Sequence, residues 1–479
     1  MTKSPLADLQ TWYNNNAKQT LSDFFTFLSF SSISTDPNYK EDIVSTAQWL
    51  STYIKGIGMD VELWETSGHP VVFATHLEAG PSRPTVLIYH HYDVQPVDPY
   101  DKWRSQPFNP VVKDNKVYAR GASDNKGQCF YTITALKAFL ALAKEVGVNI
   151  KLFIEGEEEC GSRGTTELLA KKQKELKADH LLIVDMGIPQ SGVPAITLGL
   201  RGITTLEVVL RNSNADLHSG IYGGIVLNPN QALISVLSKL WDKSGKVAVP
   251  GFYTDVVMPS KEELDQINQT LESEESLQKN YGILSFNKSC EGTLWELNTI
   301  LPTLEINGIS GGYAGKGFKT VIPSSAIAKI SCRLVPNQDP DDIAKKVIKF
   351  LKDKVDKGID IQAEFDHGGL PVRTSPTTPI AQIATDAFEH VFKKPCQKIF
   401  CGASVPIVAD LTRASGAEVA MIGVALMEDE MHAPNENFGL DRFEQGFLVM
   451  ATILQKLSEK RTPAPAKTKG KKSKSLSRV

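Results

Sequence analysis

The feature that most constrains the fold is a set of short apolar segments that end in acidic residues or histidine. Pro84–His91 (PTVLIYHH) is an almost continuous apolar run, and Lys151–Ser162 (KLFIEGEEECGS) and Leu181–Asp185 follow the same plan. A continuously apolar strand is typical of a parallel sheet that is covered on both faces. Sites in such sheets form outside the carboxyl ends of the strands. The pattern therefore predicts an α/β fold with a polar site at one edge of its sheet.

Helical patterns separate these apolar runs. Residues 6–57 repeat apolar residues at helical spacing, and further helical patterns follow Asp124 and Ser162 and occupy 380–392 and 442–459. Asp124 itself follows another short strand-like segment that runs into a glycine turn. Strand and helix thus alternate along much of the chain, as a mostly parallel sheet requires.

The periodicity changes in the middle of the chain. Residues 199–212 alternate like a half-exposed strand, 326–335 and 359–365 read as strands, and helices are predicted at 229–241 and 339–355. This order suggests a ferredoxin-like layer, whereas 251–313 predicts loops and short helices. We therefore predict that 199–370 form a domain inserted into a larger one, which is made of 1–198 and 371–460.

Length and composition agree with this division and exclude several classes of protein. A chain of 479 residues is too long for one simple core, and its net charge of −3 gives no electrostatic preference for nucleic acid. No run approaches the roughly 18 apolar residues of a membrane span, and the N-terminus has no apolar signal core. The six cysteines form no CxxC pair, which favours reduced thiols and a cytoplasmic location. The basic, low-complexity tail 461–479 is predicted to be disordered.

The polar residues that follow the strands have the chemistry of a metal site. They are His91, Asp93, Asp124, Glu158, Glu159, Asp185 and His432. Imidazole and carboxylate without thiolate suit zinc, manganese or a similar divalent ion. Because one ion needs three or four ligands, a larger set suggests two ions bridged by a carboxylate, with a water between them. The adjacent pair Glu158 and Glu159 fits a division in which one side chain binds metal and the other moves protons.

Each of these residues also has a structural reading when it is taken alone. The acidic run 155–159 could be a solvated loop, Asp124 could cap the helix that follows, and Asp185 could be an ordinary residue at a strand end. His432 could lie on a plain surface loop. One polar strand end is only a loop, but several of them with helices between favour a site. His90 points to the opposite face from His91 and is predicted to be structural.

Five motifs, in this order along the chain, resemble those of the co-catalytic di-zinc peptidase family. They are HYDVQP (91–96), ARGASDNKG (119–127), EGEEECGS (155–162), LHSG with YGG (217–224) and HAPNE (432–436). That family includes carnosinases, cytosolic non-specific dipeptidases, aminoacylases and succinyl-diaminopimelate desuccinylases. The resemblance covers nearly the whole chain except the basic tail. It is strongest for the dipeptidase branch, through HYDVQPVDP, GASDNKG and KTVIP with RLVPNQDP.

The resemblance implies roles for the polar residues. Five would bind two divalent ions, with zinc expected first and manganese or cobalt as alternatives: His91, Asp124, Glu159, Asp185 and His432. Asp124 would bridge the ions, with His91 and Asp185 on one of them and Glu159 and His432 on the other. Glu158 would be the general base. Asp93, which faces the same way as His91, would steady the site.

The resemblance also implies substrate contacts and a homodimer. His218, in DLHSG, would help hold the oxyanion from the other subunit, so that 199–370 would act as a lid and dimerisation domain. Arg333 and Thr320 would contact the substrate, and an arginine fork suits a free carboxylate. Gly402 and Ser404 would do so as well, although FCGASVP (400–406) replaces the family's GGSIP-type turn and the acidic and basic residues before it. His367 is a further candidate for substrate contact.

The expected activity is hydrolysis of the amide bond of dipeptides by a water that two metal ions activate. The alternative is an N-acyl-amino-acid deacylase that uses the same site. A third hypothesis, a non-catalytic dimeric binding protein, is disfavoured because such descendants usually lose metal ligands, and all five expected positions are filled here. The expected partners are a small peptide substrate and a second copy of the chain, without nucleic acid or membrane.

Overall fold

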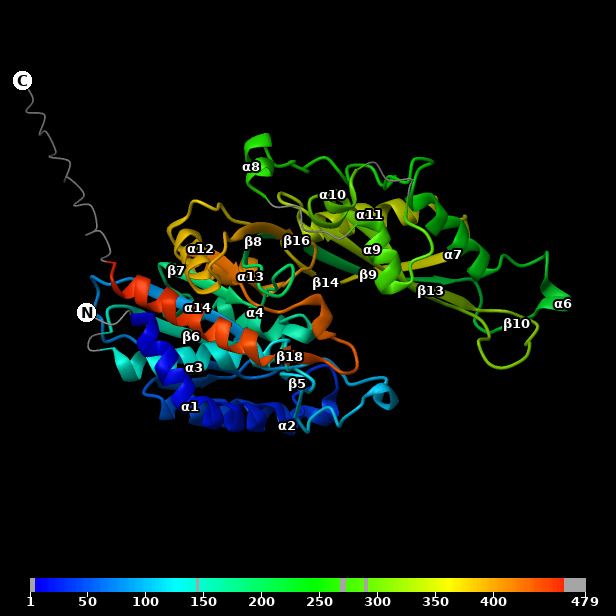
Figure 1. Cartoon of the computed structure of the whole chain (residues 1–479). Helices are drawn as coiled ribbons and strands as arrows, with labels where there is room; N and C mark the ends of the chain where they lie inside the picture. The colour runs from blue at the N-terminus through cyan, green and yellow to red at the C-terminus, as the bar shows by residue number, and fades with distance from the viewer. Residues whose placement is uncertain (1–4, 144–145, 268–272, 288–291, 461–479) are drawn as a thin grey trace, which may run out of the picture.

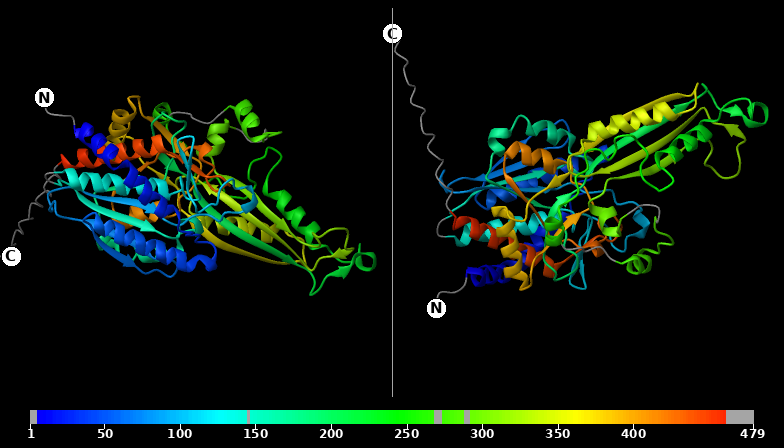
Figure 2. Two further views of the ribbon diagram at one scale, coloured as in Figure 1. Left: turned by 60° about the horizontal axis from the view of Figure 1, so that its bottom comes forward. Right: turned by 90° about the horizontal axis from the view of Figure 1, so that it is seen from above.

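The computed structural model describes residues 5–143, 146–267, 273–287 and 292–460, except for the side chains of 5–7, 262, 266, 366 and 367. The predicted disordered tail, 461–479, lies outside this range. The described chain contains a nine-stranded and a four-stranded sheet. Figure 1 shows that the part with the four-stranded sheet projects from the larger part, and Figure 2 shows the same elongated shape from two more directions.

The larger sheet is mostly parallel at its centre, as predicted. Strands β6, β3, β7 and β17 run parallel to one another, and antiparallel strands complete the edges. Across the sheet the order is β1 (Asp60–Trp64), β2 (Val71–His76), β6 (Asn149–Glu155), β3 (Thr85–His91), β7 (His180–Val184), β17 (Glu418–Ile422), β8 (Ala195–Leu200) and β15 (Val372–Arg373), with β16 (Gln397–Cys401) paired to β8.

Helices cover both faces of this sheet, which explains why its central strands are apolar throughout. Along β3, Val86 and Ile88 belong to one buried cluster, whereas Leu87 and Tyr89 belong to the other. The first cluster takes in α1 (Pro5–Leu28), α2 (Lys40–Gly56), α3 (Lys126–Leu142), α12 (Pro379–Phe392) and α14 (Leu440–Ser458). The second takes in α4 (Arg163–Leu169), α5 (Gln173–Leu176) and α13 (Ile407–Ser415).

The inserted part has the predicted ferredoxin-like order. Its antiparallel sheet runs β11 (Thr303–Ser310), β13 (Ser325–Leu334), β9 (Gly202–Arg211), β14 (Asp360–Gly369), and α7 (Pro229–Leu237) and α11 (Pro340–Lys354) pack on it. Along the chain this is strand, helix, strand, strand, helix, strand. Strand β11 lies where only loops and short helices were expected. Its register shifts between Ile306 and Gly308 and most of its residues are at least partly exposed, so no clean alternation marks it.

The chain changes sheets at Arg201. The alternating run 199–212, predicted as one strand, is in fact divided between β8 of the large sheet and β9 of the small one. The chain returns after β14, when β15 pairs with β8. These crossings lie beside the boundaries predicted at 198/199 and 370/371, which we retain as a proposal.

Short elements complete both parts of the chain. Strands β4 (Val111–Lys113), β5 (Lys116–Tyr118) and β18 (Asn437–Gly439) form one small sheet, and β10 (Leu217–His218) pairs with β12 (Val321–Ile322) in another. The remaining helices are α6 (Ser219–Tyr222), α8 (Lys261–Gln266), α9 (Glu274–Tyr281) and α10 (Leu294–Thr299). Over the described residues, none of the helices is both long and apolar enough to cross a bilayer.

Candidate metal centre

Three neighbouring strands of the large sheet place most of the predicted metal-site residues. His91 ends β3, Asp185 follows β7, and Glu158 and Glu159 lie in a 3-10 turn, Glu158–Cys160, just after β6. Because β6, β3 and β7 are parallel neighbours, these ends meet at one edge, as the sequence predicted.

The remaining two predicted ligands come from loops. Asp124 was expected at the end of a further strand of the same sheet, and this was wrong. The strand before it, β5, belongs to the small sheet with β18, and Asp124 lies in the turn that leads into α3. His432 lies in the loop after β17, where its backbone takes the left-handed conformation with φ 63°. Residues other than glycine keep this conformation when their surroundings fix it.

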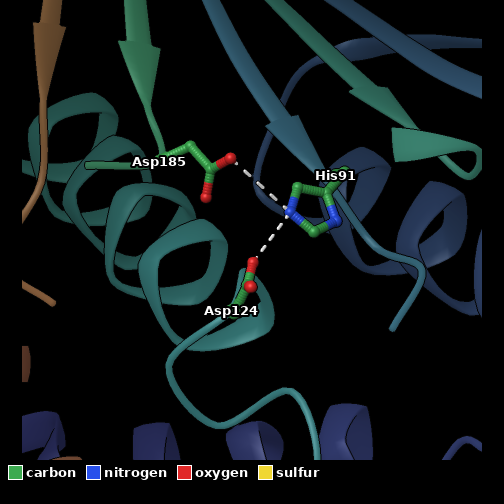
Figure 3. A group of neighbouring side chains, drawn as sticks. All are labelled: His91, Asp124 and Asp185. Carbon is green, nitrogen blue, oxygen red and sulfur yellow. Dashed lines mark hydrogen bonds and ion pairs between the residues drawn. The ribbon is translucent and has the colours of Figure 1, made fainter. Parts of the chain in front are cut away.

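His91, Asp124 and Asp185 form the first group of ligand atoms (Figure 3). The His91 Nε2 atom lies 3.1 Å from Asp124 Oδ1 and 3.7 Å from Asp185 Oδ2. All three atoms lie within 4.8 Å of one another. Such a group could enclose one divalent ion.

Asp124, Glu159 and His432 form the second group. His432 Nε2 lies 2.9 Å from Asp124 Oδ2 and 3.4 Å from Glu159 Oε2. Asp124 therefore offers one carboxylate oxygen to each group. This is the arrangement that a carboxylate bridging two ions requires.

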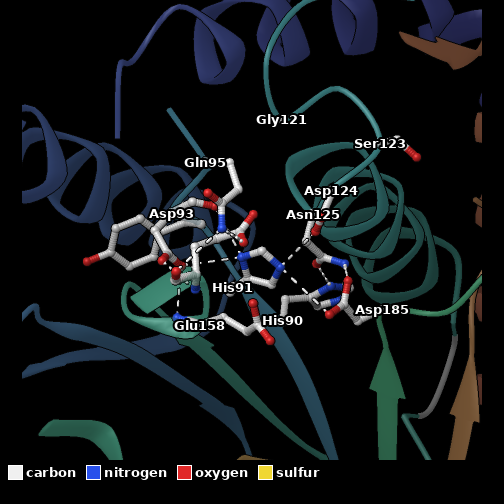
Figure 4. A network of polar contacts seen from close by, with 12 residues as sticks. His90, His91, Asp93, Gln95, Gly121, Ser123, Asp124, Asn125, Glu158 and Asp185 are labelled. Carbon is white, nitrogen blue, oxygen red and sulfur yellow. Dashed lines mark hydrogen bonds and ion pairs between the residues drawn. The ribbon is translucent and has the colours of Figure 1, made fainter. Parts of the chain in front are cut away.

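Asp93 joins the ends of β3 and β6 beside the His91 ring (Figure 4). Its carboxylate accepts the backbone N–H groups of Glu158 and Glu159, at 3.3 and 3.0 Å. The same carboxylate lies 3.3 Å from Nδ1 of His91, and neither side chain is exposed. A carboxylate on the far nitrogen of a histidine fixes the direction of the nitrogen that faces a metal. In Figure 4 the Glu158 side chain extends toward the His91 ring.

The electrostatics show a site crowded with acids that needs positive charge. Burial, together with neighbouring acids, raises the pKa of Glu158 well above its usual range and that of Glu159 to about 7. Burial alone would lower the pKa of His91, but the charge of Asp185 and the hydrogen bonds of Asp124 and Asp185 raise it well above its usual range. Hydrogen bonds to Asp124 and Glu159 raise the pKa of His432 to about 11. The directions of these shifts show that the site favours positive charge, which a pair of bound cations would supply.

A buried ion pair holds the turn that carries Asp124. The Glu436 carboxylate accepts the backbone N–H groups of Gly121, Ser123 and Asp124 at 2.8, 2.9 and 3.0 Å. It also pairs with Arg120 at 2.8 Å, and both side chains are 1% exposed. Glu436 and Arg120 stand inside the quoted motifs, but sequence reasoning gave neither of them a role.

A second buried pair grips the same turn. Asp429 accepts the Ser123 hydroxyl at 2.9 Å and forms an ion pair with Arg442. Asp429 and Glu436 both lie in the segment that carries His432. The turn and the His432 loop are therefore held to each other by these side chains and by the adjoining pairing of β5 with β18, not by the large sheet.

Two amides that the sequence did not single out hold metal-site carboxylates. Asn125 donates to Asp185, and its oxygen lies 2.8 Å from Nδ1 of His90. Gln95 donates to Glu159 Oε2 at 2.7 Å. His90 is fully buried and contacts Asn125; it belongs to neither group of ligand atoms found among the described residues.

The donor set fits a pair of divalent ions. It contains imidazole and carboxylate without thiolate, the combination that zinc and manganese accept. Glu159 Oε1 is buried and has no hydrogen-bond partner among the described residues. A buried carboxylate oxygen without a donor is costly, and a metal ion at this position would satisfy it.

Three of the predicted substrate residues lie together where the two parts of the chain meet. Arg333, on β13, donates to the Ser404 hydroxyl at 2.8 Å, and this hydroxyl donates to the Gly202 carbonyl at 3.1 Å. The Gly402 carbonyl accepts Nε of Arg201 at 2.8 Å. Arg201 was not predicted and is the residue at which the chain changes sheets.

His218 and Thr320 lie elsewhere, at the far end of the inserted part. The Ser219 N–H donates to the Thr320 carbonyl at 3.0 Å, and His218 ends β10. Figure 1 places β10 and α6 at the tip that is most distant from the large sheet. A single chain therefore does not bring His218 to the metal groups. His367 belongs to β14, and its side chain is among those that the structure does not describe.

Comparisons with known proteins agree with this geometry. Residues 87–456 match the model of the Peptidase family M20/M25/M40. A Cys-Gly metallodipeptidase of Candida albicans is 30% identical over 439 residues, which cover 88% of this chain and 90% of the relative. The Beta-Ala-His dipeptidase of Homo sapiens is 31% identical over 395 residues, with 81% and 78% covered.

Solved structures are similar over nearly the whole chain. An M20 family metallo-carboxypeptidase from Sulfolobus solfataricus has a TM-score of 0.85 at 33% identity and covers 92% of this chain and 99% of its own. Human carnosine dipeptidase 1 has a TM-score of 0.81 at 28% identity and covers 95% and 99%. One more distant neighbour of the M20 family is described as a dinuclear metal-binding peptidase. From the matched range and these relatives, the chain belongs to the Peptidase family M20/M25/M40.

Proposed function

We propose that this protein is a metal-dependent dipeptidase, which hydrolyses the amide bond of small peptides that end in a free carboxylate. The observation that carries the proposal is the pair of ligand groups that share Asp124. Membership of the peptidase family supports it, as do relatives whose names specify Cys-Gly and Beta-Ala-His dipeptides.

Five residues would hold the two ions, in the pairs predicted from the sequence. His91 and Asp185 would hold one ion, Glu159 and His432 would hold the other, and Asp124 would be shared between them. Zinc is the ion that we propose, and manganese and cobalt are the alternatives that the same donors accept. Bound there, the ions would lower the pKa of a water and polarise the scissile carbonyl.

The protein's own residues supply the proton transfers and the orientation. Glu158 takes a proton from the attacking water and passes it to the nitrogen of the leaving amine. The carboxylate of Asp93 contacts both His91 and the turn that carries Glu158, and so fixes their positions relative to each other. Its role is therefore to orient the reacting groups.

The substrate carboxylate binds where the two parts of the chain meet. Arg333 offers a planar fork with parallel donors, and Ser404 is already bonded to it. Gly402 shapes the same turn. Thr320 and His367 are proposed as further substrate contacts.

A homodimer completes the site in this proposal. His218 donates to the carbonyl oxygen of the substrate that is bound in the partner subunit, which the position of β10 at the far tip supports. Near this tip, Ile221 and Ile225 are 62% and 78% exposed. Apolar exposure of this kind is typical of a surface that another protein covers.

A charged substitution at the tip tests whether the chain forms this dimer. Ile225→Asp should yield a monomer by sedimentation and lose activity, because each site would then lack its His218. Val112→Asp, at a 47% exposed position of the large part, is the matched control and should remain dimeric and active. A monomeric Ile225→Asp variant with full activity would contradict the arrangement.

We also propose a cytoplasmic location without nucleic-acid or membrane partners. The near-neutral net charge of −3 and the free state of the described cysteines support this reading. Fractionation of cells that produce the protein would test the location.

The activity itself is tested by a metal-defined substrate panel. Protein stripped by a chelator and reloaded with zinc, manganese or cobalt would be assayed on free-amine dipeptides, tripeptides, and N-acetyl and N-succinyl amino acids. We expect metal-dependent cleavage of dipeptides above the other classes. Preference for the N-acyl amino acids would instead support the deacylase alternative, and preference for longer peptides a carboxypeptidase.

A further inference from the structure

Arg201 occupies the single position between β8 and β9, where the chain passes from the large sheet to the small one. It is 8% exposed, so its guanidinium lies inside the protein. Its backbone N–H donates to the Ala403 carbonyl at 3.1 Å. The backbone of Arg201 is thus fixed to the 400–404 turn independently of its side chain.

The side chain of Arg201 joins this turn to helix α10. Its Nε donates to the Gly402 carbonyl at 2.8 Å, and its Nη1 lies 3.3 and 3.4 Å from the carbonyls of Leu297 and Leu301. Carbonyls at a helix end lack partners within the helix, and a cation there is favourable. Within the described chain no carboxylate is in ion-pair contact with Arg201, and the charge of Glu305 acts on it without such a contact. Burial lowers the pKa of its guanidinium to about 10, which leaves it charged at neutral pH.

Helix α10 and the turn are packed closely against each other. A Cβ atom on Gly402 would lie 2.2 Å from the Asn298 carbonyl oxygen and 3.2 Å from Nη2 of Arg201. The Trp295 ring stacks on Phe400, with centroids 6.3 Å apart. The turn therefore has little freedom as long as α10 and Arg201 hold it.

The same turn carries Ser404, to which Arg333 donates. The Ser404 hydroxyl in turn donates to the carbonyl of Gly202, the residue after Arg201. One connected set of contacts thus runs from α10 through Arg201 and Gly402 to Ser404 and Arg333. If Arg201 is removed, two carbonyls of the α10 segment and one of the turn lose their donor.

We propose that Arg201 is a positioning residue, which fixes the turn of Gly402 and Ser404 against α10 and so holds Arg333 where the carboxylate of the substrate binds. This inference rests on the proposed function, because it assigns Arg201 to the carboxylate-binding part of that site. Arg201 itself need not touch the substrate. Its effect should therefore depend on whether the ligand has a carboxylate.

The test compares Arg201→Met and Arg201→Lys with the natural protein, using alanylglycine as the substrate. Glycine and glycinamide serve as competing ligands that differ only in the carboxylate. For Arg201→Met we expect KM to rise about tenfold with a much smaller change in kcat, as loss of a binding contact gives. Inhibition by glycine should weaken to the same extent, whereas inhibition by glycinamide should not change. Arg201→Lys keeps the charge but has fewer donors, so its KM and its inhibition by glycine should lie between those of Arg201→Met and those of the natural protein.

Arg373→Met is the matched control. The Arg373 guanidinium lies over the Phe400 ring, 5.3 Å from its centroid, so this variant also removes a half-buried arginine beside the turn. It should leave the ratio of glycine to glycinamide inhibition unchanged. Thermal melting and metal content would verify that each variant is folded and loaded. If Arg201→Met does not fold, Arg201→Lys carries the comparison.

Two failures are distinguishable. Equal weakening of glycine and glycinamide by Arg201→Met, or by Arg201→Lys if only that variant folds, would show a general structural role and overturn the inference. The proposed function would stand in that case if the natural protein cleaves alanylglycine. Absence of dipeptide cleavage by the metal-loaded natural protein would overturn the proposed function itself.

Discussion

The metal groups and the far tip of the inserted part are two regions to which one reaction has been assigned, and they are built in opposite ways. Among the proposed ligands His91 is buried, Asp124, Glu159 and Asp185 are partly buried, and His432 is exposed. Buried residues hold them, either directly (Asp93 and Asn125) or through the Ser123 turn (Asp429 and Glu436). The tip that carries His218 has a two-stranded sheet, a four-residue helix and exposed isoleucines. The comparison teaches that a single chain brings the proposed metal ligands together but leaves His218 far from them.

The sharpest test of the metal half is Glu158→Gln. Loss of the proton acceptor should lower kcat by about 10²–10⁴-fold, while the five proposed ligands continue to bind metal. Steady-state kinetics on a dipeptide, with metal content measured on the same sample, would show this. The same substitution at Glu428, which is exposed in the His432 loop, should have little effect. Near-normal turnover by Glu158→Gln would remove this residue from the mechanism.

The tip is tested by mixing two inactive proteins. His218→Ala should lower kcat about 10²-fold through loss of one donor to the oxyanion. If His218 serves the partner subunit, mixing equal amounts of His218→Ala and Glu158→Gln chains under exchanging conditions should restore about a quarter of the natural activity, because one site in each mixed dimer is intact. Activity that stays at the level of the separate variants would place His218 and the metals in the same chain.

Substitution of a residue that holds the Asp124 turn should weaken metal binding. Glu436→Ala leaves three backbone N–H groups and Arg120 without their acceptor, so we expect about 10–100-fold weaker metal binding. Competition with a chelator would measure it. Glu436→Gln keeps an oxygen acceptor and should lose less. Unchanged affinity in the Ala variant would mean that the turn keeps its shape without Glu436.

Burial of the metal half also predicts a small pH effect on stability. Burial raises the pKa of Glu155 from 4.5 to about 7, with Tyr89 donating to its carboxylate. The folded protein holds the Glu155 proton more tightly than the unfolded chain does. The contribution of this group to the free energy of unfolding is therefore fully present below pH 4.5 and is lost as pH rises through about 7. The melting temperature of Glu155→Gln, taken relative to that of the natural protein, should therefore be higher at pH 8 than at pH 4. A difference in melting temperature that does not vary with pH would contradict this.

The sequence predicted the parts of the site that follow from local pattern. His91, Asp185 and the Glu158–Glu159 pair end strands that are apolar because both faces of their sheet are covered, and this reads directly from composition. Asp124 and His432 were predicted from the same pattern of polar residues after strand-like segments, and the family motifs then implied a role for each of these residues. The strand before Asp124 was predicted to belong to the large sheet, and this was wrong. A short strand of a separate small sheet looks the same in sequence as a strand of the large one.

What the sequence could not predict depends on contacts between distant segments. Glu436 reaches the turn before Asp124 across more than 300 positions, and no local periodicity records such a pairing. Arg201 looked like one residue of a continuous alternating strand, whereas the chain leaves one sheet for another there. Strand β11 was missed because of its irregular register, and β16 and α13 were not identified.

The grip of Asp429 and Glu436 on the Ser123 turn has a consequence for the order in which the protein matures. Both acids and His432 are synthesised after the whole inserted segment, so a chain still growing on the ribosome has the first strand ends and lacks the groups that close the ligand cage. A chain that ended after β17 and before Asp429 would contain the strands of the large sheet but would lack Asp429, His432 and Glu436. The proposed ligand set is thus complete only once the segment that carries His432 has been made.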